Sequence, residues 1–230
     1  MVILVICVVA VIAFGLLVTA LTRRGASGFR GKRRDTKNTE RQAYAASRGW
    51  QFAEADPSLV DRWPVRPFTQ RGDNRRAFGV VHGATTGGVR FTAFDYERRA
   101  SVTSHGIHET ETYEVLTVWV LPLPAAAPDV QVFPNFIDMG ATGIPLPDKK
   151  FGSRYVVQSG DPAYAAGLFT PEVMAHMKAH KLEVWALHGS DLIYTQTMAR
   201  PNRTRPEQLE QTADQLAQLV ALLPASAWKR

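Results

Sequence analysis

The sequence predicts an α+β protein, in which an N-terminal transmembrane helix precedes a mostly antiparallel sheet domain that ends in an amphipathic helix. Three observations predict this class: residues 2–21 are apolar and uncharged, strand-like patterns occupy the middle of the chain, and a helical apolar stripe lies near its end. We expect a transmembrane helix over 1–21, a basic juxtamembrane tether over 22–41 and one folded α+β domain over 42–230.

The first element is the helix over residues 2–21. Twenty residues at a rise of about 1.5 Å each cover about 30 Å, which is the thickness of the hydrocarbon core of a bilayer. Only Met1 precedes the run, whereas a cleaved signal peptide has a positive segment there. The single cysteine, Cys7, lies inside the run, so no disulfide can form after it. We therefore expect one uncleaved crossing.

The tether carries the net charge of the chain. Between residues 22 and 41 there are eight basic and two acidic residues, so the remainder is neutral and the formal charge of +6 belongs to this segment. Positively charged flanks stay in the cytoplasm, which predicts an external N-terminus and a cytoplasmic domain in the cell membrane. Because the folded domain is not basic, nucleic acid is not an expected partner. Six side chains are suited to contact anionic headgroups: Arg23, Arg24, Arg30, Lys32, Arg33 and Arg34.

The first half of the domain is expected to hold two helices and four strands. Helical spacing predicts a helix over 36–49, and Asp56-Pro57 starts a short helix that reaches residue 63. The strands are expected over 77–84, 89–98, 111–121 and 129–133, with a hairpin turn at 85–88. The proline-rich stretch 121–128 is predicted to be a connection, since proline cannot donate to a strand ladder.

The second half is expected to follow a loop over 134–150. The predicted strands cover 154–159, 182–188 and 192–198, the last two forming a hairpin around Gly189. Helices are predicted to start at Asp161-Pro162 and at Thr170-Pro171, the second reaching residue 180. Thr204 and Glu207 have capping-box spacing before a final amphipathic helix that Pro224 ends. Seven strands in groups of four and three, then a helix, resemble a PH-like partial barrel.

Two histidine groups invite a metal-site hypothesis. His176 and His180 are spaced as zinc ligands on a helix, but the general-base glutamate of zinc peptidases is missing between them, so solvated histidines are favoured. His105, His108, Glu109 and Glu111 cluster near a predicted hairpin tip that lacks a rigid surrounding shell. We predict no metal, cofactor or catalytic residue.

Other residues are interpreted structurally. The carboxylates Asp95, Glu97 and Glu114 are expected to form ion pairs with Arg98 and Arg99 across the strands. Seven aromatic residues form either the core or, alternatively, an exposed groove for a peptide or lipid. They are Trp50, Phe52, Trp63, Phe68, Phe91, Phe94 and Tyr96.

Several short motifs suggest a family. They are Gly49-Trp50, Arg62-Trp63-Pro64, Pro67-Phe68, residues 91–96, residues 121–124 and residues 222–224. This set resembles uncharacterised actinobacterial proteins that have one N-terminal span and a soluble domain of unknown function. The resemblance covers about residues 41–224 and implies the architecture, but no catalytic residue.

The expected function is non-catalytic. A single-pass anchor would present a cytoplasmic domain to membrane-protein partners or to the lipid surface as a scaffold, and tethering would raise its effective concentration there. One alternative is an accessory subunit of a larger membrane complex, such as a respiratory assembly. Another is a metal-dependent enzyme built on the histidine loop.

Overall fold

The computed structural model describes residues 38–105, 108–138, 140–196 and 204–228. The chain divides into two compact units, Met1–Glu40 and Arg41–Arg230. The second unit has an α+β fold with an antiparallel sheet, which confirms the predicted class. The predicted membrane span and the six headgroup-contact side chains lie outside the described residues.

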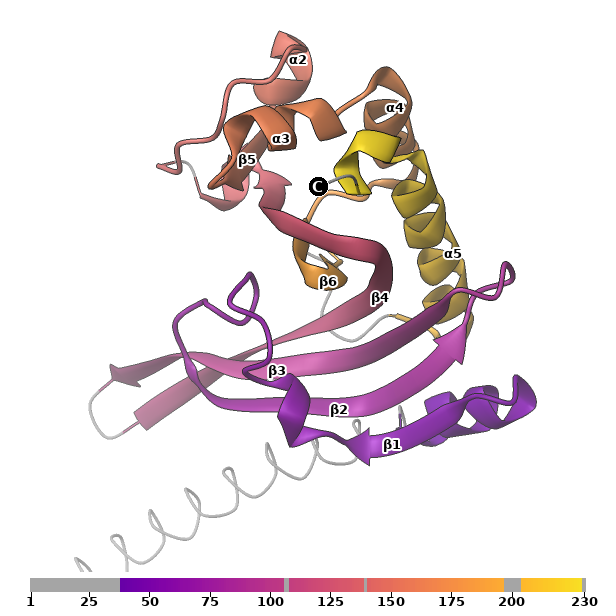
Figure 1. The fold of residues 1–230 in the computed structure, drawn as a ribbon. Coiled ribbons are helices and arrows are strands. Elements are labelled where there is room, and N and C mark those ends of the chain that lie inside the picture. Colours follow the sequence, from indigo (N-terminus) through magenta and orange to yellow (C-terminus); the bar gives the residue numbers. More distant parts are fainter. Residues whose placement is uncertain (1–37, 106–107, 139, 197–203, 229–230) are drawn as a thin grey trace, which may run out of the picture. The chain divides into compact units, whose positions relative to one another are not determined.

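The sheet contains six strands within the described residues. They are β1 (Gln51–Ala55), β2 (Asp73–Ala84), β3 (Arg90–His105), β4 (His108–Pro134), β5 (Tyr155–Ser159) and β6 (Trp185–Thr195). Their order is β1-β2-β3-β4-β5, and β6 pairs with the other edge of β4. All of these pairings are antiparallel (Figure 1).

Most of the helices lie in the second half of the unit, near β5 and β6, whereas the helix at residues 38–47 precedes β1. The α-helices are α2 (Lys149–Gly152), α3 (Pro162–Leu168), α4 (Pro171–His180) and α5 (Pro206–Leu222), and the 3-10 helices are η1 (Pro57–Leu59), η2 (Asn135–Ile137) and η3 (Ala225–Trp228). Asp161 accepts a hydrogen bond from Tyr164 N at 3.0 Å, and Thr170 accepts one from Val173 N at 3.3 Å. These caps confirm the predicted starts of α3 and α4.

The predicted connection over 121–128 is wrong, because these residues belong to the single long strand β4. β3 pairs with β4 as far as Val120 and β5 pairs with it from Val130, so one edge of β4 has no strand partner between them. The prolines at 122, 124 and 128 lie in this gap, where β4 has irregular register and fewer ladder hydrogen bonds to lose. The other edge still pairs with β6 while β4 bends (Figure 1).

The predicted hairpin around Gly189 is also wrong. β6 runs without reversal from Trp185 to Thr195, and Gly189 has a φ of +56°, which places it in a bulge rather than in a turn. The register between β4 and β6 shifts at Ala127, which pairs with Gly189. The glycine therefore lets β6 follow the bend of β4. Two pairs of predicted strands thus become single strands, and β1, which the sequence did not predict, is added, so the sheet has six described strands instead of the predicted seven.

Two helices also differ from the prediction, one at its end and one at its start. The segment after Asp56 is a single 3-10 turn that ends at Leu59, although Asp56 does cap it by accepting from Ser58 N at 2.9 Å. At α5 the N-cap is Arg205 rather than Thr204, and Gln208 Oε1 accepts from Arg205 N at 2.8 Å. The Thr204 side chain is instead buried and bonds to Thr117.

The sheet has a core on each face. On one face the predicted stripe of α5 (Leu209, Ala213, Leu216, Leu219) packs together with Trp119, Leu121 and the helices near β5. On the other face the segment from η1 to residue 68 covers Phe94, Tyr96 and Val120. Of the seven aromatic side chains named above, five are buried and Trp50 and Phe52 are partly buried, so the cluster is mainly core.

Candidate functional site

A large hollow of the described fold is an open groove that begins on the second face of the sheet. Its volume is about 690 Å³. The segment from η1 to residue 68 covers only part of this face, and the groove begins where that cover ends. The residues that line it are apolar in part, namely Trp50, Leu59, Trp63, Phe91, Val120 and Pro122, and polar in part, namely Asp56, Arg62, His82, Arg90, Thr92 and Asp191.

A hydrogen bond across the sheet fixes the position of Trp63. Its Nε1 donates to Asp191 Oδ2 at 2.8 Å, which joins the covering segment to β6. The Arg62 guanidinium lies 5.0 Å from the centre of the Trp63 ring and 3.8 Å from the same carboxylate. Trp63 itself is buried against Phe68 and Phe94. The covering segment is therefore held in place, and the Arg62 side chain, 57% exposed, remains available at the rim.

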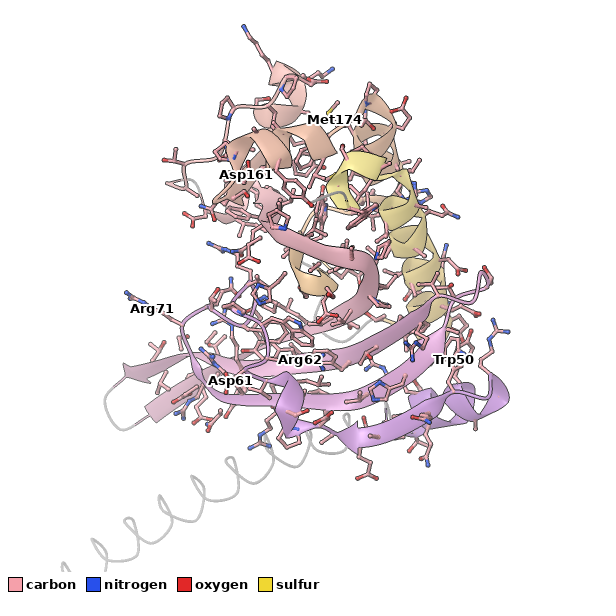
Figure 2. All side chains as sticks on the ribbon, in the orientation of Figure 1. Trp50, Asp61, Arg62, Arg71, Asp161 and Met174 are labelled. Carbon is pink, nitrogen blue, oxygen red and sulfur yellow. The ribbon has the colours of Figure 1, made fainter. Side chains whose placement is uncertain are left out.

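The opposite end of the groove depends on a glycine. A Cβ atom on Gly83 would lie 2.7 Å from the Trp50 ring and 2.9 Å from Phe91, so only glycine allows the tryptophan to lie this close to β2. Trp50 and Phe91 meet edge to face, with ring centres 5.2 Å apart. Trp50 and Arg62 thus line one groove from separate segments of the chain (Figure 2).

The polar groups of the groove have internal partners. Asp56 Oδ1 accepts from the Ser58 hydroxyl and backbone, and these bonds, helped by the nearby His82 and Arg62, hold the pKa of the carboxyl below its ordinary value. His82 Nδ1 lies 3.0 Å from Thr92 Oγ1. The two carboxylates are therefore engaged within the protein, so a ligand would meet the exposed cations of Arg62 and Arg90 beside the partly buried Trp50.

A second polar cluster is buried where the helix at residues 41–47 meets the sheet. Arg41 Nη2 donates to Asp95 Oδ1 at 2.6 Å, and Arg41 Nη1 donates to Gly79 O at 2.9 Å. The two side chains are only 2% and 1% exposed. Thr117 Oγ1 also donates to Asp95 Oδ1, at 2.8 Å. This ion pair fastens the first helix of the unit to β2, β3 and β4.

The cluster extends toward the start of α5. Thr117 Oγ1 lies 2.9 Å from Thr204 Oγ1, which donates to Gln196 Oε1 at 3.1 Å. These bonds connect the end of β6 and the approach to α5 with the buried pair. Sequence analysis assigned Arg41 to the basic tether by its charge, whereas its side chain belongs to the interior of the folded unit.

The remaining candidates from the sequence occupy ordinary settings. His176 Nε2 lies 2.8 Å from Gln215 O, and its ring centre lies 4.5 Å from that of His180. Of the predicted cross-strand ion pairs, that of Arg98 with Glu114 is confirmed. Arg99 pairs instead with Asp73 and Glu111, and the prediction for Asp95 is wrong because its partner is Arg41. The side chains of His105, His108 and Glu109 lie outside the described residues.

Sequence reasoning missed the buried pair and the close approach at Gly83. Asp95 follows an apolar run in an alternating strand, at a position where the inward face continues, and that is the one signal that could have identified it as buried. Nothing in the sequence identifies Arg41 as its partner, because the two residues are 54 positions apart.

Comparison with known proteins finds a similar solved structure but no sequence match. No protein family model matches the chain, and no curated protein matches it in sequence. Among solved structures the fold is similar to an actinobacterial protein. That structure is the mycobacterial trehalose monomycolate transport factor A, TtfA, with a TM-score of 0.54 and 16% identity, covering 81% of this chain and 96% of the other. At this identity the likeness establishes the fold alone.

None of the helices within the described residues has the length and apolar character needed to span a bilayer. Within those residues there is likewise no group of three or more histidine, cysteine or acidic side chains arranged to hold a metal ion.

Proposed function

We propose that this chain is a membrane-anchored, non-catalytic accessory protein that presents its α+β unit at the cytoplasmic face to a membrane transporter. The observation that carries the proposal is the fold: it covers 96% of a chain described as a transport factor. That description favours a transporter, rather than a respiratory assembly, as the partner complex.

The sequence of the first 41 residues supports the anchoring part of the proposal. An apolar run of bilayer length followed by a strongly basic tether is typical of a single crossing with a cytoplasmic C-terminal domain. Tethering keeps the domain in the same plane as a membrane partner, so an interface of modest affinity suffices.

The groove supports the binding part of the proposal. It is lined by the partly buried Trp50 and by the exposed Arg62 and Arg90 side chains, and tryptophan and arginine are frequent anchors in protein interfaces. Its carboxylates are already engaged by Ser58 and Trp63. The groove is thus suited to recognise a complementary surface, and it requires no chemical step.

The experiment has a topology arm and a binding arm. In the topology arm, a fluorescent reporter that matures only in the cytoplasm is fused after Arg230 and should fluoresce. In the binding arm, the full chain is purified in mild detergent and should carry one integral-membrane transporter at a constant molar ratio of transporter to chain. Arg62→Glu should reduce that ratio at least threefold. Arg154→Glu, an exposed arginine outside the groove, should not change it. A silent reporter would contradict the topology, and an unchanged ratio for both variants would contradict a role for the groove.

The basic tether supports an additional contact with the lipid surface. Arg23, Arg24, Arg30, Lys32, Arg33 and Arg34 would each contribute on the order of 1 kcal/mol near an anionic surface. A peptide of residues 22–41 should therefore bind vesicles that contain about 30% anionic lipid, and it should be released from them in high salt. Equal binding to neutral vesicles would contradict this contact.

A further inference from the structure

The floor of the groove includes a row of side chains that crosses four strands. Gln51 pairs with His82, His82 pairs with Thr92, and Thr92 pairs with Val120. Residues directly opposite each other on paired strands face the same side, and all of these residues line the groove. Three strand spacings of about 4.8 Å give the row a length of about 14 Å. An extended peptide, at about 3.4 Å per residue, covers this length with about four residues.

The row is recessed and mostly polar. Gln51 and His82 are exposed, Thr92 is half-buried and Val120 is buried. His82 Nδ1 lies 3.0 Å from Thr92 Oγ1, which fixes the two polar side chains in the middle of the row. The amide of Gln51 offers both donors and an acceptor to the backbone of an occupant. A peptide that crosses the strands therefore meets polar side chains along much of its length.

Arg90 supplies a positive charge beside this row. It is the first residue of β3, and its cross-strand partner on β2 is Ala84. The Arg90 side chain is exposed, and it has no ion-pair partner within the part of the chain that the structure describes. Its charge is therefore available to a ligand in the groove.

Arg62 supplies a second positive charge from the covering segment. Its guanidinium lies 5.0 Å from the centre of the Trp63 ring and 3.8 Å from Asp191 Oδ2. An ion pair of this length is weak on a side chain that is 57% exposed. The guanidinium has five N–H donors, so it can bind a further carboxylate while Trp63 restricts its position.

The strand register brings both arginines toward Pro122. On one edge of β4, Pro122 pairs with Asp191, the carboxylate beside Arg62. On the other edge, Thr92 pairs with Val120, and Arg90 and Pro122 each lie two residues beyond that pair, in the same direction along the sheet. Arg90 and Asp191 are therefore on opposite sides of Pro122, and the two cations flank this end of the groove.

The charges favour an anionic occupant. Asp56 already accepts hydrogen bonds from Ser58, and Asp191 accepts one from Trp63. The exposed arginines have no comparable partner, so the groove is complementary to carboxylates.

The shape of the groove favours an extended peptide among anionic ligands. A single small anion would contact the arginines and leave the row that crosses the strands unused. A flat lipid surface would not reach the half-buried Thr92. A peptide with carboxylate side chains at one end uses both the arginines and the polar row.

We propose that the groove binds an extended, acidic segment of the partner protein, which crosses the strands from Gln51 toward Pro122 and places carboxylates against Arg62 and Arg90. The inference rests on the proposed function, because it names the chemistry of the segment that the transporter presents. Its test uses a synthetic peptide, so the two proposals fail separately. Peptide binding without a co-purified transporter supports the groove chemistry and contradicts the choice of partner.

The probe is a fluorescently labelled eight-residue peptide in which two glutamates follow a stretch of serine and threonine. Fluorescence anisotropy measures its binding to the full chain in neutral detergent micelles at about 0.1 M salt, where long-range charge attraction is screened. We expect saturable binding. A peptide with lysines in place of the glutamates should bind at least tenfold more weakly.

Charge reversal at Arg90 tests the site itself. Arg90→Glu should weaken binding of the glutamate peptide at least tenfold and strengthen binding of the lysine peptide at least threefold. Arg154→Glu makes the same change of net charge at an exposed arginine that does not line the groove, and it should leave both affinities unchanged. Circular dichroism of both variants checks that they fold.

Several results would overturn the inference. One is the absence of saturable binding by the glutamate peptide at millimolar concentration. Equal binding of the glutamate and lysine peptides, or equal effects of the two charge reversals, would indicate nonspecific attraction. Displacement of the peptide by an equal concentration of inorganic phosphate, at constant ionic strength, would identify a site for small anions instead.

Discussion

The buried ion pair between Arg41 and Asp95 gives the sharpest prediction about stability. Both groups are almost completely inaccessible, at 2% and 1% exposed, and their atoms lie 2.6 Å apart. Arg41→Met removes the cation while preserving most of the side-chain volume. Asp95 then remains buried as a charge whose main cationic partner is gone, and such a loss costs about 3–5 kcal/mol. At about 2–4 °C per kcal/mol for a domain of this size, Tm should fall by about 6–20 °C.

The double variant Arg41→Met with Asp95→Leu tests the reasoning. It removes both charges, and apolar replacements of buried ion pairs are often nearly neutral. We expect it to be more stable than Arg41→Met alone, with a coupling energy of at least about 1 kcal/mol in a double-mutant cycle. Guanidinium unfolding of the full chain in micelles, followed by tryptophan fluorescence, measures this. Strictly additive losses, or a loss below about 1 kcal/mol for Arg41→Met, would refute the account of the buried pair.

Two further predictions concern the groove and the hairpin. Gly83→Ala should lower the free energy of unfolding by about 1–3 kcal/mol, because the new methyl group overpacks against Trp50. Gly87→Ala is the control and should be nearly neutral in the same assay, since its new Cβ meets no atom closer than 3.9 Å. Equal effects of the two substitutions would contradict the close approach of Trp50 to Gly83. Arg99 holds the pKa of Asp73 below its ordinary value. The ionised carboxylate therefore stabilises the folded state at pH values above its unfolded pKa of about 3.9. This stabilisation is lost as the pH falls through the lower pKa of the folded state. Asp73→Asn should therefore flatten the acid limb of a stability–pH curve, and an identical limb would argue against the pair.

The sequence predicted local structure well where one short pattern determines it. The caps at Asp161 and Thr170 and the apolar stripe of α5 all follow from residues that are close in the chain. The turn at 85–88 also forms as predicted, with Thr85 N donating to Val89 O and Gly88 at a φ of +80°. Capping and turn geometry are decided within a few residues, so tertiary contacts do not override them.

The errors arose where tertiary pairing decides the outcome. Proline at 122 and glycine at 189 ordinarily interrupt strands, yet both lie in strands that bend together. Neither signal alone indicates that the two segments are neighbours. The partnership of Arg41 with Asp95 is missed for the same reason, because charge composition carries no information about burial.

The site was predicted only in outline. The aromatic cluster was recognised as either core or groove. In the structure Trp63, Phe94 and Tyr96 are buried in the core, whereas Trp50 is only partly buried and lines the groove. The groove itself depends on where the covering segment ends and on the bond from Trp63 to Asp191, which are 128 residues apart. Separations of that size are not readable from local patterns.

The central claim is that this chain binds a transporter in the membrane as an accessory protein. Native mass spectrometry of the full chain, released from its own membranes in mild detergent, tests it most directly. The account predicts one dominant species in which the 25.4 kDa chain accompanies an integral-membrane transporter in fixed stoichiometry. Recovery of the chain alone, or in the soluble fraction without detergent, would contradict it.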